Sequence, residues 1–272
     1  KELNVAIFGL IEREINKFIL QLSSRAEYLS VTPEIHHGVS NIDIDQVVKR
    51  EFSIISAGIG IFRNWQNWEL SLSTMLTGRT PGIEDLYSDG PHLGTYSYEI
   101  GQPNLDLEKT IGLEASSVYQ TNRSKIRLTG FQNFSPNYHI SSKTGDCDEE
   151  FIIGENHPCA GADFIEWGAG SSGWLYKYQM QGLRSLIYGF ESELYYKLTK
   201  TINLFGSVSI LRGENLSGNT PLSYMPPDKF LLSTEVDLDP FLLALQVKRV
   251  SPQTRLGEFG RRTEGFITAG LN

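Results

Sequence analysis

Apolar and polar side chains alternate along one stretch of the chain, Leu105-Asp106-Leu107-Glu108-Lys109-Thr110-Ile111-Gly112-Leu113-Glu114-Ala115-Ser116-Ser117-Val118-Tyr119. Most of its apolar residues occupy odd positions, and two of its acidic residues, Glu108 and Glu114, occupy even ones. A period of two is that of a β-strand, whose successive side chains point to opposite faces, whereas a helix repeats every 3.6 residues. The stretch therefore predicts a strand with one apolar and one polar face, in which Leu107 and Leu113 face outward to lipid and Glu108 and Glu114 face inward. Leu186, Tyr188 and Leu194 of a later strand are expected to face outward as well.

The same alternation recurs along most of the chain, in segments bounded by turn-forming residues. It is clear after Phe18, Trp68 and Leu186, and further strands are predicted at 3–11, 51–63, 125–139, 202–212, 228–238, 241–251 and 263–271. This gives about eleven strands by the usual strand signals and no long helix. No segment approaches the run of about 18 apolar residues that a transmembrane helix needs, although that test does not detect membrane strands. The sequence therefore predicts an all-β antiparallel fold.

The connections between these strands alternate between short and long. Short turns are predicted at 12–16, 64–67, 121–124, 199–201 and 237–240, and long polar loops at 29–50, 80–104, 140–172, 213–227 and 252–262. Outer-membrane β-barrels have short periplasmic turns and long extracellular loops, and their strands need about 9–11 residues. The pattern favours a transmembrane barrel over its alternative, a soluble or cell-surface β-sandwich that binds ligands through its loops.

The charge of the chain argues against one class of partner. The 272 residues carry 24 Lys and Arg against 32 Asp and Glu, a net charge of −8. Nucleic-acid binders that follow the phosphate backbone are basic, so we expect no nucleic-acid partner. Glutamates on the polar faces, such as Glu69, Glu114, Glu191 and Glu193, are instead expected to line a polar lumen.

A sequence signature lies between Arg79 and Glu108 and resembles that of the TonB-dependent outer-membrane receptors. The family pattern runs Arg-x-Pro, a Leu-Tyr step, Gly-x-His, and Glu-x-Gly-Asn-x-x-Leu-x-x-Glu. The matching residues are Arg79, Pro81, Leu86, Tyr87, Gly90, His92, Glu99, Gly101, Leu105 and Glu108, with Gln102 in place of the usual Asn. Later landmarks are Gly189-Phe190-Glu191, Pro221-Leu222, Pro226-Pro227 and Glu264-Gly265-Phe266, so the resemblance extends over nearly the whole chain.

The resemblance implies a larger protein than the chain itself. Such receptors have a plug domain ahead of a barrel of about 22 strands. We expect residues 1–272 to form the second half of that barrel without its last strand pair, because no plug-like segment precedes Lys1 and Asn272 is not the usual terminal aromatic residue. The rest of the barrel and the plug must then be supplied, since unpaired strand edges cannot face lipid.

The resemblance also implies a function. It predicts an active transporter in the outer membrane of a Gram-negative bacterium, which binds a scarce nutrient and imports it with energy from the TonB complex, contacted through the plug. A ferric siderophore or a metal ion is the favoured substrate, with an oligosaccharide or cobalamin left open. No cofactor and no enzymatic activity are expected, because no catalytic motif stands in its required context. A passive porin is the remaining alternative.

One segment combines groups suited to a metal or its chelate, and the resemblance places it at the mouth of the barrel. His92, Tyr96, Tyr98 and Glu99 are therefore predicted to bind substrate, with His92 as a metal ligand. Neutral imidazole ligates borderline cations, and aromatic rings pack on a chelator's rings.

Further candidate metal ligands, His36, His37, Asp148 and His157, lie in two other predicted loops. His36 and His37 are adjacent in the first, although neighbours on an extended chain point to opposite sides. Asp148 and His157 belong to an acidic cluster bracketed by Cys147 and Cys159 and offer oxygen and imidazole ligands. The cysteine spacing resembles neither a zinc site nor a redox motif, and an outer-surface loop is exposed to oxidising conditions, so a Cys147–Cys159 disulfide is predicted.

Overall fold

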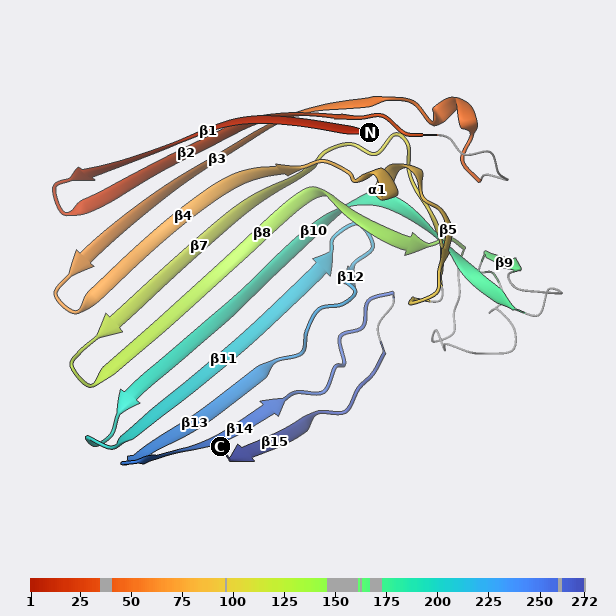
Figure 1. Ribbon diagram of the computed structural model, residues 1–272. Helices are drawn as coiled ribbons and strands as arrows, with labels where there is room; N and C mark the ends of the chain where they lie inside the picture. The colour runs from red at the N-terminus through yellow and green to blue at the C-terminus, as the bar shows by residue number, and fades with distance from the viewer. Residues whose placement is uncertain are drawn as a thin grey trace.

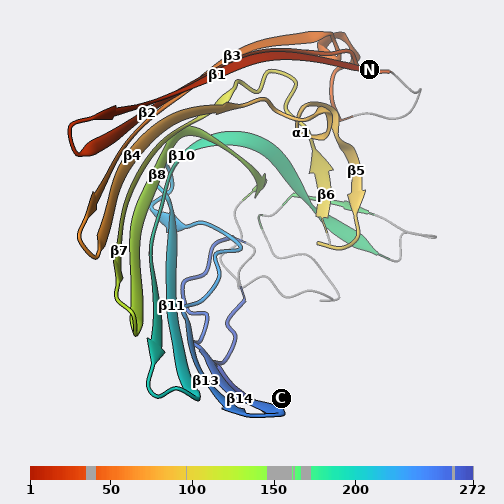
Figure 2. The same ribbon diagram turned by 60° about the vertical axis from the view of Figure 1, so that its left-hand side comes forward.

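The chain forms one curved, open antiparallel sheet. The computed structural model describes residues 1–34, 41–95, 97–145, 161, 163–166, 173–258 and 261–271. Within these residues, eleven strands follow one another across the sheet in chain order, which confirms the predicted fold class and the strand number. Figure 1 shows the strands running side by side with the same tilt, and Figure 2 shows the sheet bent so that one face is concave.

The eleven main strands are joined by tight turns at one end of the sheet and by long connections at the other. Their bounds are β1 Glu2–Ile15, β2 Phe18–Val31, β3 Arg50–Trp65, β4 Trp68–Arg79, β7 Glu108–Gln120, β8 Ser124–Lys143, β10 Trp174–Lys197, β11 Ile202–Asn215, β13 Lys229–Leu238, β14 Phe241–Val250 and β15 Phe266–Leu271. In the β1–β2 and β3–β4 turns, Asn16 and Gln66 have φ angles of 57° and 53°, the left-handed conformation that tight hairpins require. We call these two ends the turn end and the loop end.

Several short elements lie at the loop end. They are the 3₁₀ turn Ile44–Gln46, helix α1 Ile83–Tyr87, and strands β5 Asp89–His92, β6 Ser97–Ile100, β9 Phe164–Glu166 and β12 Thr220–Pro221. The region predicted as loop 80–104 thus holds a helix and a two-stranded hairpin. Strands β2, β8 and β11 also continue beyond the predicted loop starts, because neighbouring strands extend their hydrogen-bond ladders.

The strand register separates two faces of the sheet. Leu113 of β7 stands opposite Gln132 of β8, which stands opposite Tyr188 of β10, and residues directly opposite share a face. Leu186 and Leu194 therefore lie on the same face as Leu113, as predicted. This face also carries the exposed Leu70, Leu72, Ile111 and Phe190, and it is the convex face.

The other, concave face carries the charged side chains. Glu114 stands opposite Phe131, Glu191 opposite Thr129, and Glu193 opposite Arg127, with 3.9 Å between Arg127 Nε and a Glu193 carboxylate oxygen. The buried cluster of Leu29, Val31, Phe52, Leu86 and Leu105 also lies on this side, at the loop end beneath α1. The fold is therefore a segment of barrel wall, not the two packed sheets of the alternative β-sandwich.

The structure corrects the prediction at the start of the deciding stretch. Leu105 and Leu107 precede β7, which begins at Glu108. Leu105 is buried in the cluster and Leu107 packs against it, so the expectation that Leu107 faces outward with Leu113 is wrong. The physical reason is that α1 covers this part of the concave side and buries nearby apolar groups. Among the described residues, no helix is both long and apolar enough to cross a bilayer.

Candidate functional site

Three of the residues predicted to bind substrate, His92, Tyr98 and Glu99, lie on a hairpin at the loop end. Strands β5 and β6 pair with each other, and β6 also pairs in parallel with β10, where Tyr98 stands opposite Lys177 and Glu99 opposite Tyr178. Figure 2 shows this hairpin and α1 on the concave side of the sheet. The fold therefore holds His92, Tyr98 and Glu99 over the concave face.

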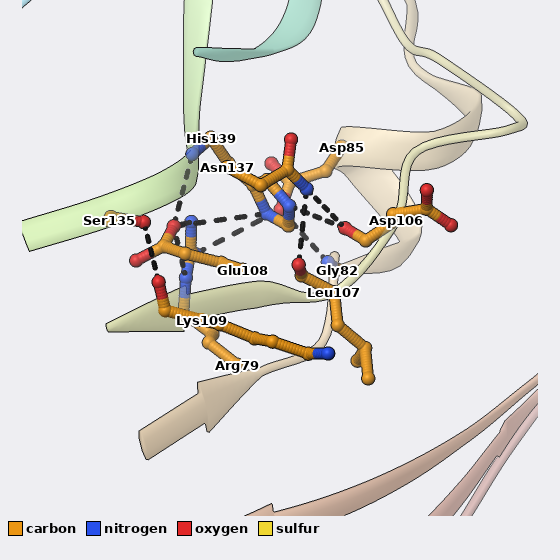
Figure 3. Close-up of polar contacts among 10 residues, drawn as sticks. All are labelled: Arg79, Gly82, Asp85, Asp106, Leu107, Glu108, Lys109, Ser135, Asn137 and His139. Carbon is orange, nitrogen blue, oxygen red and sulfur yellow. Dashed lines mark hydrogen bonds and ion pairs between the residues drawn. The ribbon is translucent and has the colours of Figure 1, made fainter. Parts of the chain in front are cut away.

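Polar contacts between β4, α1 and β7 hold the two ends of this segment together (Figure 3). Arg79, the last residue of β4, stands opposite Glu108, the first of β7, with 2.9 Å between Arg79 Nη2 and Glu108 Oε2. Asp85 of α1 lies 4.0 Å from Arg79 and accepts a 2.9 Å hydrogen bond from the backbone N–H of Gly82. The first and last residues of the signature, which are 29 positions apart in the sequence, therefore lie side by side and form an ion pair.

Strand β8 completes this frame. Its His139 donates a backbone hydrogen bond to Glu108 Oε2 at 3.1 Å, and its ring Nε2 lies 2.7 Å from the carbonyl oxygen of Asp106. The Asn137 amide donates to the carbonyl oxygen of Leu107 at 3.1 Å (Figure 3). A carbonyl only accepts, so the ring proton of His139 lies on Nε2. The His139 side chain is 1% exposed, which makes it part of the frame and not of an accessible site.

Close backbone packing accounts for the other signature residues. Leu86 is fully buried, and Pro81 is among the most buried side chains. A Cβ added to Gly101 would lie 2.5 Å from the backbone nitrogen of Tyr87 and 2.5 Å from the carbonyl carbon of Leu86. The Gly101 N–H donates to the carbonyl oxygen of Ser88 at 2.7 Å. These signature positions therefore position the hairpin.

His92 is the exposed imidazole of this hairpin. Its Nδ1 lies 2.9 Å from Glu99 Oε1 and 2.9 Å from Thr95 Oγ1, and the Ser97 hydroxyl donates to Glu99 Oε1 at 3.2 Å. An ionised carboxylate only accepts, so in the neutral form of the ring the contact with Glu99 favours the tautomer with its proton on Nδ1. The His92 side chain is 59% exposed. A carboxylate bonded to one ring nitrogen in this way fixes the orientation of the imidazole.

Tyr98 occupies a different environment on the same hairpin. It is 7% exposed, and its hydroxyl donates to Asp89 Oδ1 at 3.0 Å. Burial raises the pKa of Tyr98, and the hydrogen bond to Asp89 raises it further. Asn41 donates its backbone and side-chain N–H groups to the Asp89 carboxylate at 2.7 and 2.8 Å, so Tyr98 and Asp89 tie the segment around Asn41 to the hairpin.

Two other loops place side chains that the sequence did not mark near this region: Tyr224 close to Glu99 of the hairpin, and Glu258 against Lys143 of β8. Partial burial, followed by the charge of Glu99, raises the pKa of Tyr224, which lies in the β12–β13 connection. Glu258, after β14, accepts a 2.5 Å hydrogen bond from the backbone N–H of Lys143, and burial raises the pKa of its carboxyl group. The sequence marked the loop of Tyr224 as long and proline-containing, through Pro221-Leu222 and Pro226-Pro227, but it did not mark Tyr224 itself.

The remaining predicted ligands lie outside the described residues. They are Tyr96, His36, His37, Asp148, His157 and the cysteine pair Cys147 and Cys159. Among the residues that are described, no group of three or more His, Cys, Asp or Glu side chains could hold a metal ion. Of the predicted site residues, the structure therefore brings His92 and Glu99 into direct contact.

Comparisons with known proteins agree with this architecture. The chain has the fold of a structure titled copper transporter OprC, with a TM-score of 0.73 at 16% identity over 98% of this chain. A mutant of the ferric enterobactin receptor PfeA from Pseudomonas aeruginosa gives a TM-score of 0.66 at 15% identity over 99% of this chain. The FrpB iron transporter from Neisseria meningitidis gives 0.65 at 11% identity, also over 99%.

The chain spans 38% of the length of the OprC and FrpB structures and 37% of the PfeA structure, as part of a barrel wall would. A sequence family described as "TonB dependent receptor-like, beta-barrel" matches residues 2–269. Family members are outer-membrane transporters, not enzymes. The open meander, the framed hairpin over its concave face and this match together identify the chain as a member of the TonB-dependent receptor β-barrel family.

Proposed function

We propose that the protein containing this chain is an active transporter of the Gram-negative outer membrane that binds a metal ion or a ferric siderophore at its loop end. The carrying observation is the His92–Glu99 pair, in which a carboxylate holds an exposed imidazole over the concave face. The printed names of the similar structures, a copper transporter, a ferric enterobactin receptor and an iron transporter, support this substrate class.

The two parts of the pair have different roles in this proposal. His92 contacts the metal or its chelator through Nε2, while Glu99 orients the ring and adds negative charge that favours a cation. Tyr224 borders Glu99 and supplies a ring that can pack on a chelator. Tyr98 acts through the position of the hairpin, because its hydroxyl is engaged by Asp89.

Partners follow from the same proposal. The convex face contacts outer-membrane lipid, the edges β1 and β15 pair with the rest of the barrel, and a plug domain connects the lumen to the TonB complex. No cofactor and no nucleic acid take part. Energy coupling separates this transporter from a passive porin, because only the former loses uptake when the proton gradient is collapsed.

The test is a binding titration of the full-length receptor with ferric enterobactin, Cu²⁺ and Zn²⁺, each as a separate probe. His92→Ala should weaken binding of the true substrate at least about tenfold, equivalent to roughly 1.4 kcal/mol. The matched control is Asn122→Ala, in the short β7–β8 turn at the opposite end of the sheet, which should bind as wild type does.

Uptake into cells with and without a protonophore completes the test. Equal affinities of wild type and His92→Ala for every probe that binds would remove His92 from the site. Uptake that continues after the gradient is collapsed would refute active transport.

A further inference from the structure

A groove crosses the convex face of the sheet near the turn end. Its floor is made of small residues on two neighbouring strands, Ala115 and Ser117 of β7 and Gly130 of β8. Larger apolar side chains form its walls, with Leu70 and Leu72 on β4, Leu128 on β8 and Phe190 on β10. The volume of the groove is about 610 Å³, within the range of small-ligand sites.

A basic side chain lies at one end of this apolar groove. Arg63 of β3 stands opposite Leu70, and its guanidinium carbon lies 5.0 Å from the centre of the Phe18 ring. Its Nε atom is buried and has no hydrogen-bond partner, and no carboxylate of the described residues forms an ion pair with it. The rest of Arg63 is partly exposed and lines the groove, so its guanidinium group is suited to an anion that enters there.

Aromatic residues mark the depth of Arg63 in a membrane. Trp65, two residues further along β3, pairs with Trp68 at the β3–β4 turn, and both are exposed. The Trp68 ring lies 4.8 Å from the Tyr119 ring on the same face. Tryptophan and tyrosine gather at the headgroup level of membrane proteins, so Arg63 lies at that level and the groove extends from it toward the apolar centre.

We propose that this groove binds one phospholipid, with its phosphodiester on Arg63 and an acyl chain over Ala115 and Gly130. The charge of Arg63 matches the phosphate, and the apolar walls match the chain. The inference rests on the proposed function only in placing the convex face against a bilayer. Substrate binding at the loop end, on the opposite face, is not required for it.

The experiment is native mass spectrometry of the full-length receptor in detergent. Three probes are added separately: phosphatidylglycerol, a diacylglycerol with the same acyl chains, and glycerol phosphate. Wild type should retain one phosphatidylglycerol at least about tenfold more strongly than the diacylglycerol, as one charge-assisted hydrogen bond implies. Glycerol phosphate alone should not be retained, because it lacks the chain that fills the groove.

Two variants separate the roles of the charge and of the groove. Arg63→Gln should lower phosphatidylglycerol retention to the level of the diacylglycerol. Gly130→Leu should reduce retention of both lipids, because a Cβ at Gly130 meets no atom within 4 Å and the new side chain would occupy the groove without a clash. The control is Arg123→Gln, a basic residue in the β7–β8 turn that does not line the groove.

The lipid proposal and the transport proposal fail separately. Equal phosphatidylglycerol retention by wild type, Arg63→Gln and Arg123→Gln would overturn the lipid site, even if substrate uptake is normal. Strong binding of glycerol phosphate alone would overturn it too, since the site would then be one for free phosphate. Heat-dependent gel mobility reports whether each variant is folded, and retention is compared only among folded receptors.

Discussion

Replacing Gly101 by Ala tests whether the signature segment is a rigid frame for the hairpin. The added Cβ would lie 2.5 Å from backbone atoms of Leu86 and Tyr87, about 1 Å inside ordinary contact distance. Backbone cannot yield as a flexible side chain can, so α1 and the β6 end must separate.

The loss of stability in Gly101→Ala follows from the contacts that break when α1 and the end of β6 separate. Two backbone hydrogen bonds join these segments, Gly101 N–H to Ser88 O at 2.7 Å and Gln102 N–H to Asp85 O at 2.8 Å. Their loss, or overpacking if they hold, corresponds to about 1–3 kcal/mol. We expect this destabilisation in the segment between β4 and β7, because the strand ladders of the sheet do not include these bonds.

Hydrogen–deuterium exchange of the full-length receptor measures this local loss of stability directly. Amides of α1 and of the β5–β6 hairpin should exchange about five- to 150-fold faster in Gly101→Ala, since 1.4 kcal/mol corresponds to a factor of ten. Gly90→Ala is the matched control in the same segment, because its Cβ would meet no atom within 4 Å. If Gly101→Ala exchanges like Gly90→Ala, the close backbone approach does not maintain the hairpin.

Two further predictions concern the sheet and a predicted disulfide. Leu113→Arg on the convex face should lower the free energy of unfolding in lipid by about 2–4 kcal/mol if the site is near the bilayer midplane. Glu114→Arg on the concave face should lower it much less. Similar losses for the two variants in denaturant titrations would contradict the assignment of faces. Cys147 and Cys159 should appear as one linked peptide in mass spectrometry of an unreduced tryptic digest, and full alkylation of both thiols in protein never exposed to reductant would exclude the bond.

The main sheet was predictable because each strand carries its own local signal. Alternation places Leu113 and Glu114 on opposite faces without any knowledge of their neighbours, and the alternating connection lengths separate the two ends of the sheet. The error at Leu107 has a non-local cause, since that residue continues the alternation but packs against a cluster that includes Leu86 and Phe52.

The candidate site was less predictable, for the same reason. The resemblance drew attention to His92 and Glu99, and their 2.9 Å contact spans only seven residues. By contrast, the contact of Glu258 with Lys143 joins positions 115 residues apart, and the proximity of Tyr224 to Glu99 depends on the curvature of the whole sheet. Neither the alternation of residues nor the composition of the sequence predicts contacts between positions so far apart. Burial of Tyr98 was likewise invisible, because its partners Asp89 and Asn41 meet it only after the segments fold together.

The parallel pairing of β6 with β10 has a consequence for the order of assembly. Each main strand of the sheet pairs with the next main strand along the chain, but Ser97 of β6 meets Tyr176 of β10, which is 79 residues later. Closing so long a loop costs entropy that only the finished ladder offsets, and contacts of large sequence separation form slowly. We therefore expect the hairpin that carries His92 to reach its final position after β7, β8 and β10 have joined the sheet.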